Sequence, residues 1–396
     1  MIPLSMVIIG FAHIIAKKPT CCKVVKRLYL NKFLIFFYLS LYIKQKIFYN
    51  KGDLRIVLKS KFELEVIHVA KKKIMVPYPV LKEGLTELFE RYDVYYPSHI
   101  PHRKDILEVL PEYDALISCG FLANAEAVAH MDNVKIMSTY GVGYDNVDLK
   151  AMNERGILVC NLPDVVTEST AEFALGLILG VMRRIPETDH KLRLIPDLRW
   201  GPIANLGHGL NGKRLGILGM GRIGKAVARR ARPFLMDITY HNRHRLPVEV
   251  EAEYGAAYIP TMEQLLKESD VVVVNLPLTN ETRHLLGMEQ FEMMKRSAYF
   301  INVGRGPIVN EPELIEALNK GVIAGAGLDV FEHEPNIPNA FKGMPNVVLG
   351  AHMATATVET RTEMVRLAAK NIIDYLEYGK HPNLVNPEAL ANKRPL

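Results

Sequence analysis

The sequence predicts an α/β protein with two doubly wound domains, each a parallel sheet covered by helices on both faces. From Lys72 onward, short apolar segments alternate with amphipathic helical segments, which is the order typical of parallel sheets. Many of the apolar segments are Val/Ile-rich runs with little alternation, as in strands covered on both faces. A second such series starts after Trp200, and one more amphipathic helix follows it. We therefore place the second domain inside the first.

In the first series, residues 73–79 and 114–120 are predicted strands and residues 80–92 a helix. The segment 134–149 is predicted to be a strand that ends in a glycine turn. A long helix is expected at 167–185, opened by a cap residue, Thr167, Ser169 or Thr170. The six strands of the second series are expected within 214–224, 237–243, 270–278, 298–306, 325–332 and 346–352, and the last helix within 357–380.

Composition supports two globular domains and excludes several classes of protein. A chain of 396 residues with 49% hydrophobic and 23% charged residues is long enough for two cores. The net charge of +6 is mild, which argues against a nucleic-acid-binding face. The cysteines Cys21, Cys22, Cys119 and Cys160 have neither metal-ligand nor disulfide-framework spacing. We therefore expect no metal and a reducing compartment, the cytoplasm.

Residues 1–71 differ in composition from the remainder. They contain apolar runs at 2–16 and 33–43, and lysines and asparagines interrupt this part of the chain. Neither run reaches the roughly 20 apolar residues that span a bilayer. We expect an N-terminal extension of unknown role outside the main body. A membrane anchor or a targeting segment is the alternative.

A glycine-rich turn predicts a dinucleotide-binding site. Gly219, Gly221 and Gly224 have G-x-G-x-x-G spacing between an apolar strand and a helical pattern. Such glycines permit a tight turn and let the backbone approach a pyrophosphate at the helix N-terminus. We therefore expect the cofactor at this turn, including Arg222 and Ile223. The alternative is a tight turn that binds no ligand.

The end of the next strand indicates which dinucleotide binds. Asn242 lies 18 residues after Gly224, close to the spacing of the residue that meets the adenosine ribose. A carboxylate there would repel a 2′-phosphate, and Asn242 does not. Arg243 offers a planar fork for phosphate, with Arg245 and two histidines nearby. NADPH is therefore predicted. NADH stays open if these cations are only solvated surface charges.

Three segments of the second domain carry reactive side chains just past the ends of predicted strands: Arg305, then Asp329 and Glu334, then His352. Open α/β sheets bind their ligands at this edge. A guanidinium binds a carboxylate and polarises a carbonyl, an imidazolium donates a proton, and a neighbouring carboxylate favours the charged imidazole. The set suits hydride reduction of a 2-oxo acid. Taken singly, Arg305 could form a surface ion pair, and Glu334 and His352 could be structural.

From about Lys72 to about Val385 the sequence resembles the D-isomer-specific 2-hydroxyacid dehydrogenases. The matching motifs are GVGYDNVDL, TAEFALGLIL, LNGKRLGILGMGRIG, INVGRGPIVNEPELIEAL, GAGLDVFEHEP and AHMATATVETR. Within that family, the sequences NR after the second strand, GRGP and TVETR are most similar to those of NADPH-linked glyoxylate/hydroxypyruvate reductases and their relatives that take larger 2-oxo acids. The resemblance implies that Arg305 binds and orients the substrate, that His352 is the acid/base, and that Glu334 pairs with His352.

The same resemblance implies further roles. Backbone groups of Val142 and Gly143 would bind the substrate carboxylate, and Asp329 the nicotinamide amide. Leu276 and Pro277 would line the adenosine side, and Val303 would pack on the cofactor. The implied architecture is a Rossmann cofactor domain, 171–353, inserted into a flavodoxin-like substrate domain, 72–170 and 354–390. The implied assembly is a homodimer.

The sequence departs from the family pattern on both sides of His352, where MATAT follows instead of the usual glycine or alanine shortly after the histidine. Where relatives usually carry proline before the catalytic histidine, this chain has Ala351, which predicts a looser loop around His352. Two other functions stay open. A formate dehydrogenase would resemble a version with glutamine in place of Glu334. A dinucleotide-sensing corepressor or scaffold would keep the same three residues without catalysis.

Overall fold

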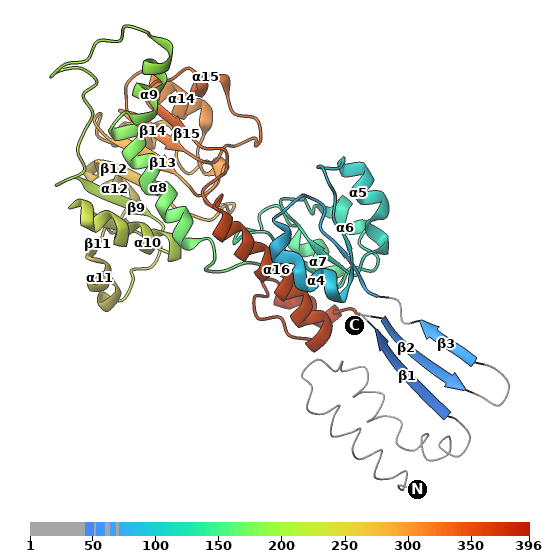
Figure 1. Cartoon of the computed structure of the whole chain (residues 1–396). Coiled ribbons are helices and arrows are strands. Elements are labelled where there is room, and N and C mark those ends of the chain that lie inside the picture. The colour runs from blue at the N-terminus through green and yellow to red at the C-terminus, as the bar shows by residue number, and fades with distance from the viewer. Residues whose placement is uncertain (1–43, 51–52, 60–63, 69–70) are drawn as a thin grey trace. The chain divides into compact units, whose positions relative to one another are not determined.

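The computed structural model describes residues 44–50, 53–59, 64–68 and 71–396 (Figure 1). Contacts divide the chain into two compact units. One contains residues 141–145 and 162–364, and the other contains 146–161, 365–396 and the described residues up to Tyr140. The apolar runs at 2–16 and 33–43 lie outside the described residues. Within the described part, no helix is long and apolar enough to cross a bilayer.

The unit with residues 162–364 is built on a seven-stranded parallel sheet. Its strands are β9 (Arg214–Leu218), β10 (Asp237–His241), β11 (Ala256–Tyr258), β12 (Val271–Val274), β13 (Tyr299–Asn302), β14 (Gly325–Leu328) and β15 (Val347–Leu349). Their order is β11-β10-β9-β12-β13-β14-β15, and every neighbouring pair is parallel. This is the Rossmann order with one added strand, and the order reverses between β9 and β12. The predicted fold class is confirmed.

Helices cover both faces of this sheet (Figure 1). One face packs against α8 (Thr167–Met182) and α10 (Arg222–Ala231), and the other against α12 (Met262–Glu268), α13 (Met288–Met293) and α14 (Glu311–Asn319). The unit also contains α9 (Ile185–Leu194), α11 (Val248–Tyr254) and α15 (Asn339–Lys342). All four valines of β12 are fully buried, because a central strand between two helical layers has no solvent-facing side.

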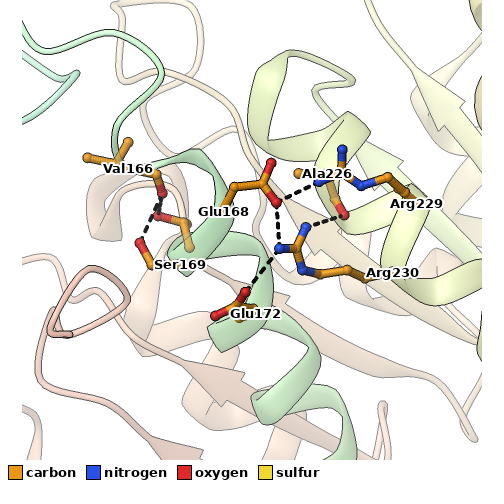
Figure 2. A network of polar contacts seen from close by, with 8 residues as sticks. Val166, Glu168, Ser169, Glu172, Ala226, Arg229 and Arg230 are labelled. Atoms are coloured by element: carbon orange, nitrogen blue, oxygen red, sulfur yellow. Dashed lines mark hydrogen bonds and ion pairs between the residues drawn. The ribbon is translucent and has the colours of Figure 1, made fainter. Parts of the chain in front are cut away.

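A cluster of charged side chains joins α8 to α10 (Figure 2). Glu168 of α8 accepts hydrogen bonds from Arg229 and Arg230 of α10, and Glu172 accepts one from Arg230. The hydrogen bonds from Arg230 and Arg229 hold the pKa of Glu168 below its ordinary value against the effect of burial. The helix that follows the glycine turn is thereby fixed against α8.

The expected cap of α8 was wrong. The helix begins at Thr167, as predicted, but its N-cap residue is Val166, and no side chain caps the backbone N–H groups there. The hydroxyls of Ser169 and Thr170 instead donate to the carbonyl oxygen of Val166, and Figure 2 shows the contact of Ser169. A hydroxyl that donates backwards in this way leaves the first N–H groups of the helix without a side-chain acceptor.

The second unit has a five-stranded parallel sheet in the order β5-β4-β6-β7-β8, the flavodoxin-like order. The strands are β4 (Lys73–Met75), β5 (Asp93–Tyr95), β6 (Ala115–Ile117), β7 (Ile136–Ser138) and β8 (Leu158–Cys160). Its helices are α4 (Thr86–Arg91), α5 (Arg103–Val109), α6 (Ala125–Ala129), α7 (Leu149–Glu154) and the part of α16 (Val358–Tyr378) from Val365 onward. The helix predicted at 80–92 begins as a 3-10 turn, η1 (Lys82–Leu85), and continues as α4.

The described residues before Lys71 form a separate antiparallel sheet. It consists of β1 (Lys44–Asn50), β2 (Asp53–Lys59) and β3 (Leu64–His68), in that order. The sequence did not predict this sheet, because this segment lacks the alternation of strand and helix patterns that marks the remainder.

Candidate active site

The three glycines from the end of β9 to the first turn of α10 have three different environments. Gly219 has a φ of +94°, and a Cβ there would lie 2.9 Å from the carbonyl oxygen of Asn275. A Cβ on Gly224 would lie 2.4 Å from the carbonyl oxygen of Gly219, whereas a Cβ on Gly221 would meet nothing within 4 Å. The turn therefore needs the first glycine for its backbone, the third for helix packing, and has open space at the second. A dinucleotide pyrophosphate requires this arrangement.

Asn242 connects the end of β10 to the glycine turn. Its side-chain oxygen Oδ1 accepts a hydrogen bond of 2.7 Å from the N–H of Met220. Since a backbone N–H only donates, this contact fixes the orientation of the amide. The donor atom Nδ2 is then the end of Asn242 that remains for a ligand. A donor suits the oxygens of a 2′-phosphate.

The basic residues after β10 divide into two groups. Arg245 donates from Nε and Nη2 to the two carboxylate oxygens of Glu251, both at 2.8 Å, and Tyr240 donates to the same carboxylate. Arg245, expected near the phosphate, is thus paired with Glu251 in this structure, and its contact with a phosphate stays a prediction. Arg243 and His244 are exposed. Among the described residues, Arg243 forms no hydrogen bond or ion pair, so its guanidinium is available to an anion.

His352 and Glu334 form the pair that the resemblance implies. The distance from His352 Nδ1 to Glu334 Oε2 is 2.7 Å, so Nε2 is the ring nitrogen left to exchange a proton with a ligand. Glu334 also accepts from the N–H of Phe331 through Oε1. Burial acts to raise the pKa of Glu334, but the hydrogen bond and charge of His352, the Phe331 N–H and the charge of Arg305 together hold it below its ordinary value. The carboxylate is therefore ionised at neutral pH.

Asp329 holds the loop that carries His352. Its carbonyl oxygen accepts from the N–H of His352, and its two carboxylate oxygens accept from the N–H groups of Met353 and Ala354, each at 2.9 Å. Burial raises the pKa of Asp329 above its ordinary value against the effect of these hydrogen bonds. His352 has a φ of +51°, a conformation that needs such support. The loop, which has Ala351 in place of a proline, is thus held by hydrogen bonds to the buried Asp329.

Arg305 lies beside the glycine loop of residues 141–145. Its Nε donates to Asp145 Oδ1 at 2.9 Å, and its Nη1 donates to the carbonyl oxygen of Gly304 at 2.9 Å. The backbone of Gly306 abuts that of Phe331, where a Cβ would lie 1.9 Å from a carbonyl carbon. The loop of Arg305 and the loop of Glu334 are therefore in contact. This contact agrees with the pKa of Glu334, which burial acts to raise and the charge of Arg305 helps to lower.

Comparisons with known proteins show the family of this chain. The model of the D-isomer specific 2-hydroxyacid dehydrogenase NAD-binding domain matches residues 175–354. The glyoxylate reductase of Thermococcus litoralis is 41% identical over 332 residues, which cover 82% of this chain and 100% of that protein. The chain belongs to the D-isomer specific 2-hydroxyacid dehydrogenase family. It is an NAD(P)-dependent oxidoreductase that acts on 2-hydroxy acids.

Two further relatives of this dehydrogenase illustrate the range of the match. The glyoxylate reductase of Aeropyrum pernix is 43% identical over 343 residues, 82% of this chain and 98% of that protein. The crystal structure of an NADPH-dependent glyoxylate/hydroxypyruvate reductase from Sinorhizobium meliloti, in complex with NADP and malonate, matches with a TM-score of 0.70 and 31% identity. That match covers 83% of this chain and 100% of the other.

The other cofactor residues expected in the dehydrogenase have varied environments. Arg222 pairs with Asp164 at 2.6 Å, with both side chains largely exposed. Ile223 and Val303 pack in the core cluster on the α8 side of the sheet. Leu276 packs on the opposite cluster, and Pro277 is exposed. Contact of these residues with a cofactor stays a prediction, as do the roles of Val142 and Gly143 and the domain limits 171–353.

Sequence reasoning assigned no role to two further polar side chains of this dehydrogenase, Asp145 and Asn275. Asp145 lies inside the motif GVGYDNVDL, but only backbone groups of that motif were assigned a role. Asn275 directly follows β12, at the point where the strand order reverses. Its Oδ1 and Nδ2 are buried, and neither has a hydrogen-bond partner among the described residues. A buried amide of this kind is costly unless a further group satisfies it, so a polar ligand at this edge fits the residues present.

Proposed function

We propose that this dehydrogenase reduces a small 2-oxo acid of the glyoxylate or hydroxypyruvate type to the D-2-hydroxy acid with NADPH. The observation that carries the proposal is the His352–Glu334 pair at 2.7 Å on a loop in contact with the loop of Arg305. The names of the relatives in Thermococcus litoralis and Aeropyrum pernix support glyoxylate as the substrate. The complex of the Sinorhizobium meliloti reductase supports an NADP cofactor.

The proposed mechanism assigns one task to each side chain. Arg305 binds the substrate carboxylate and polarises the carbonyl, with backbone groups of Val142 and Gly143 on the same carboxylate. The glycine turn, Asn242 and Arg243 would hold NADPH, which when bound would supply a hydride for C2 of the substrate and leave as NADP+. His352 donates the proton from Nε2 to the carbonyl oxygen, and Glu334 stabilises the imidazolium through Nδ1. The carbonyl group gains one hydride at C2 and one proton at its oxygen, which gives the 2-hydroxy acid.

A panel of substrates tests the activity. The purified full chain is assayed with glyoxylate, hydroxypyruvate and pyruvate with NADPH and with NADH, and with formate and the oxidised cofactors. We expect turnover of the first two with NADPH and none of formate. Arg305→Ala should lower kcat/KM by at least about a hundredfold, because it removes a donor to the developing charge. No turnover of any 2-oxo acid would instead favour the corepressor or scaffold.

The cofactor preference is tested by separate changes of the two arginines after β10. Arg243→Ala should raise the KM for NADPH by about tenfold or more and leave the KM for NADH unchanged, since each factor of ten corresponds to about 1.4 kcal/mol of lost phosphate binding. Arg245→Ala should leave the NADPH-to-NADH ratio unchanged, because its guanidinium is held by Glu251. Equal effects of both changes would show that the phosphate assignment is wrong.

We also propose that the dehydrogenase is a cytoplasmic homodimer. Several large apolar side chains are exposed on α9 and in the segment that follows it: Ile185, Leu192, Leu194, Ile195, Trp200, Ile203 and Leu206. Apolar surface gathered in one stretch of chain is typical of protein interfaces. Light scattering should give twice the mass of one chain, and a monomer at micromolar concentration would contradict the proposal.

A further inference from the structure

Arg305 is held in place before any substrate binds. Two of its three nitrogens have partners, Nε with Asp145 Oδ1 at 2.9 Å and Nη1 with the carbonyl oxygen of Gly304 at 2.9 Å. The side chains of Arg305 and Asp145 are 28% and 33% exposed, so the ion pair is partly shielded from water. A long, flexible guanidinium side chain is thereby restricted to one orientation.

The third nitrogen, Nη2, lies directly against Gly143. A Cβ on Gly143 would lie 1.7 Å from Nη2, 2.8 Å from Cζ of Arg305 and 2.9 Å from Asp145 Oδ1. The guanidinium therefore rests on the backbone of the loop at a position that only glycine leaves open. This is the loop whose backbone groups are proposed to bind the substrate carboxylate. By their contacts, residues 141–145 belong to the compact unit of residues 162–364, which contains Arg305. The residues directly before and after them in the sequence belong to the other unit.

We propose that Asp145 is a positioning residue for the 2-oxo acid. Its carboxylate holds Nε of Arg305, so that Nη2 stays against the backbone of Gly143 before the substrate arrives. Asp145 itself does not touch the substrate in this arrangement. The inference rests on the proposed reduction of a 2-oxo acid and adds to it the group that aligns the substrate-binding arginine.

The position of Asp145 predicts which kinetic constants change. Without its acceptor at Nε, Arg305 gains alternative orientations, and a misplacement of about 1 Å at a reacting group can lower turnover by about a hundredfold. Both the binding of the substrate carboxylate and the polarisation of its carbonyl use the same guanidinium. The KM for the 2-oxo acid should therefore rise and kcat should fall. The glycine turn of NADPH lies on other segments, so NADPH affinity should not change.

The test compares Asp145→Ala, Asp145→Asn and the unchanged full chain. Asp145→Ala should lower kcat/KM for glyoxylate by about tenfold to a hundredfold and raise the inhibition constant of oxamate, a non-reactive 2-oxo acid analogue. Asp145→Asn keeps an oxygen that accepts from Nε, so it should recover to within about threefold of the unchanged protein. The dissociation constant of NADPH, measured by fluorescence, should agree within about twofold for all three proteins.

A matched control removes an arginine partner elsewhere. Asp132 pairs with Arg155 at 2.7 Å outside the site, and Asp132→Ala should leave every kinetic constant unchanged. An unchanged kcat/KM of Asp145→Ala would overturn the inference. So would a loss of NADPH affinity as large as the loss of kcat/KM, or a kcat/KM of Asp145→Asn as low as that of Asp145→Ala. An unchanged chain that turns over no 2-oxo acid would overturn the proposed function and this inference with it. An active chain with an equally active Asp145→Ala variant would overturn this inference alone.

Discussion

Asp329 shows how one buried carboxylate shapes the loop of a reactive histidine. The side chain is 1% exposed, and three N–H groups of residues 352–354 donate to its backbone and carboxylate oxygens. The sequence predicted that the missing proline at position 351 would loosen this loop. In the structure the hydrogen bonds of Asp329 provide the support instead. Sequence reasoning had considered Asp329 as a reactive carboxylate at the strand ends and as a ligand of the nicotinamide amide, not as a support of this loop.

Replacement of Asp329 by asparagine should therefore affect both stability and catalysis. The amide presents Nδ2 to one of the two N–H groups, which then loses its acceptor, and an unsatisfied buried donor costs about 1–3 kcal/mol. Urea unfolding should show this loss, and kcat for glyoxylate should fall because His352 is displaced. An asparagine variant with unchanged stability and kcat would contradict this role of Asp329.

Glu251 provides a stability prediction with a defined pH range. The hydrogen bonds from Arg245 and Tyr240 lower its pKa from the ordinary value of 4.5 to about 2. A carboxyl group whose pKa is lower in the folded state stabilises the fold above its unfolded pKa, and the effect is lost as pH falls through the folded pKa. The Tm of Glu251→Gln should therefore be lower than that of the unchanged protein at pH 7. The two values should converge between pH 4.5 and about 2, and a constant difference would contradict the assignment.

The residues that sequence reasoning found are those whose position along the chain carries information. Glu334 and His352 follow predicted strand ends, and parallel strands end at one edge of a sheet. Asp145 and Glu251 depend on partners that only the folded chain reveals. Arg305 lies 160 residues from Asp145 in the sequence, and no local pattern links them. The sequence likewise did not reveal that Arg245 pairs with Glu251.

At the level of elements, two glycines at the turn from β9 to α10 should have different roles: Gly221 in cofactor binding and Gly224 in the stability of the fold. Gly221→Ala places a methyl group in the open space where a pyrophosphate would bind, so NADPH affinity should fall while the free energy of unfolding stays the same. Gly224→Ala places a methyl group 2.4 Å from the carbonyl oxygen of Gly219, so it should lower stability by about 1–3 kcal/mol. Urea unfolding and NADPH titration of both variants check this. Equal losses of stability would contradict it.

The sequence predicted the central strands better than the edge strands. Strands β9, β10 and β12 to β15 lie within the predicted segments, and α16 at Val358–Tyr378 agrees with the helix expected at 357–380. Within the two parallel sheets, the strands that were not predicted are β5, β8 and β11, which each have three residues and lie at sheet edges. β15, of the same length and also at a sheet edge, did lie within a predicted segment, but a strand of three residues is generally too short to show a hydrophobic period. Its place is set by pairing with its neighbour.

At the level of the whole molecule, two strand-and-helix series predicted two sheets, and both are present in their expected orders. The N-terminal sheet of β1 to β3 had no such signal, and the matched relatives cover 82% of this chain. The proposed catalytic residues, the glycine turn and the loop of residues 141–145 all belong to one compact unit. The proposed chemistry therefore depends on that unit for its acid, its arginine and its cofactor turn.

The most direct test of the account is the turnover number of His352→Asn with glyoxylate and NADPH. The account predicts that kcat falls by at least about a hundredfold, the usual contribution of a general acid, with NADPH affinity unchanged. His284→Asn is the matched control, because His284 also contacts a carboxylate, Glu332, at 2.6 Å, and should keep full activity. A His352→Asn variant that keeps kcat within about tenfold of the unchanged protein would contradict the account.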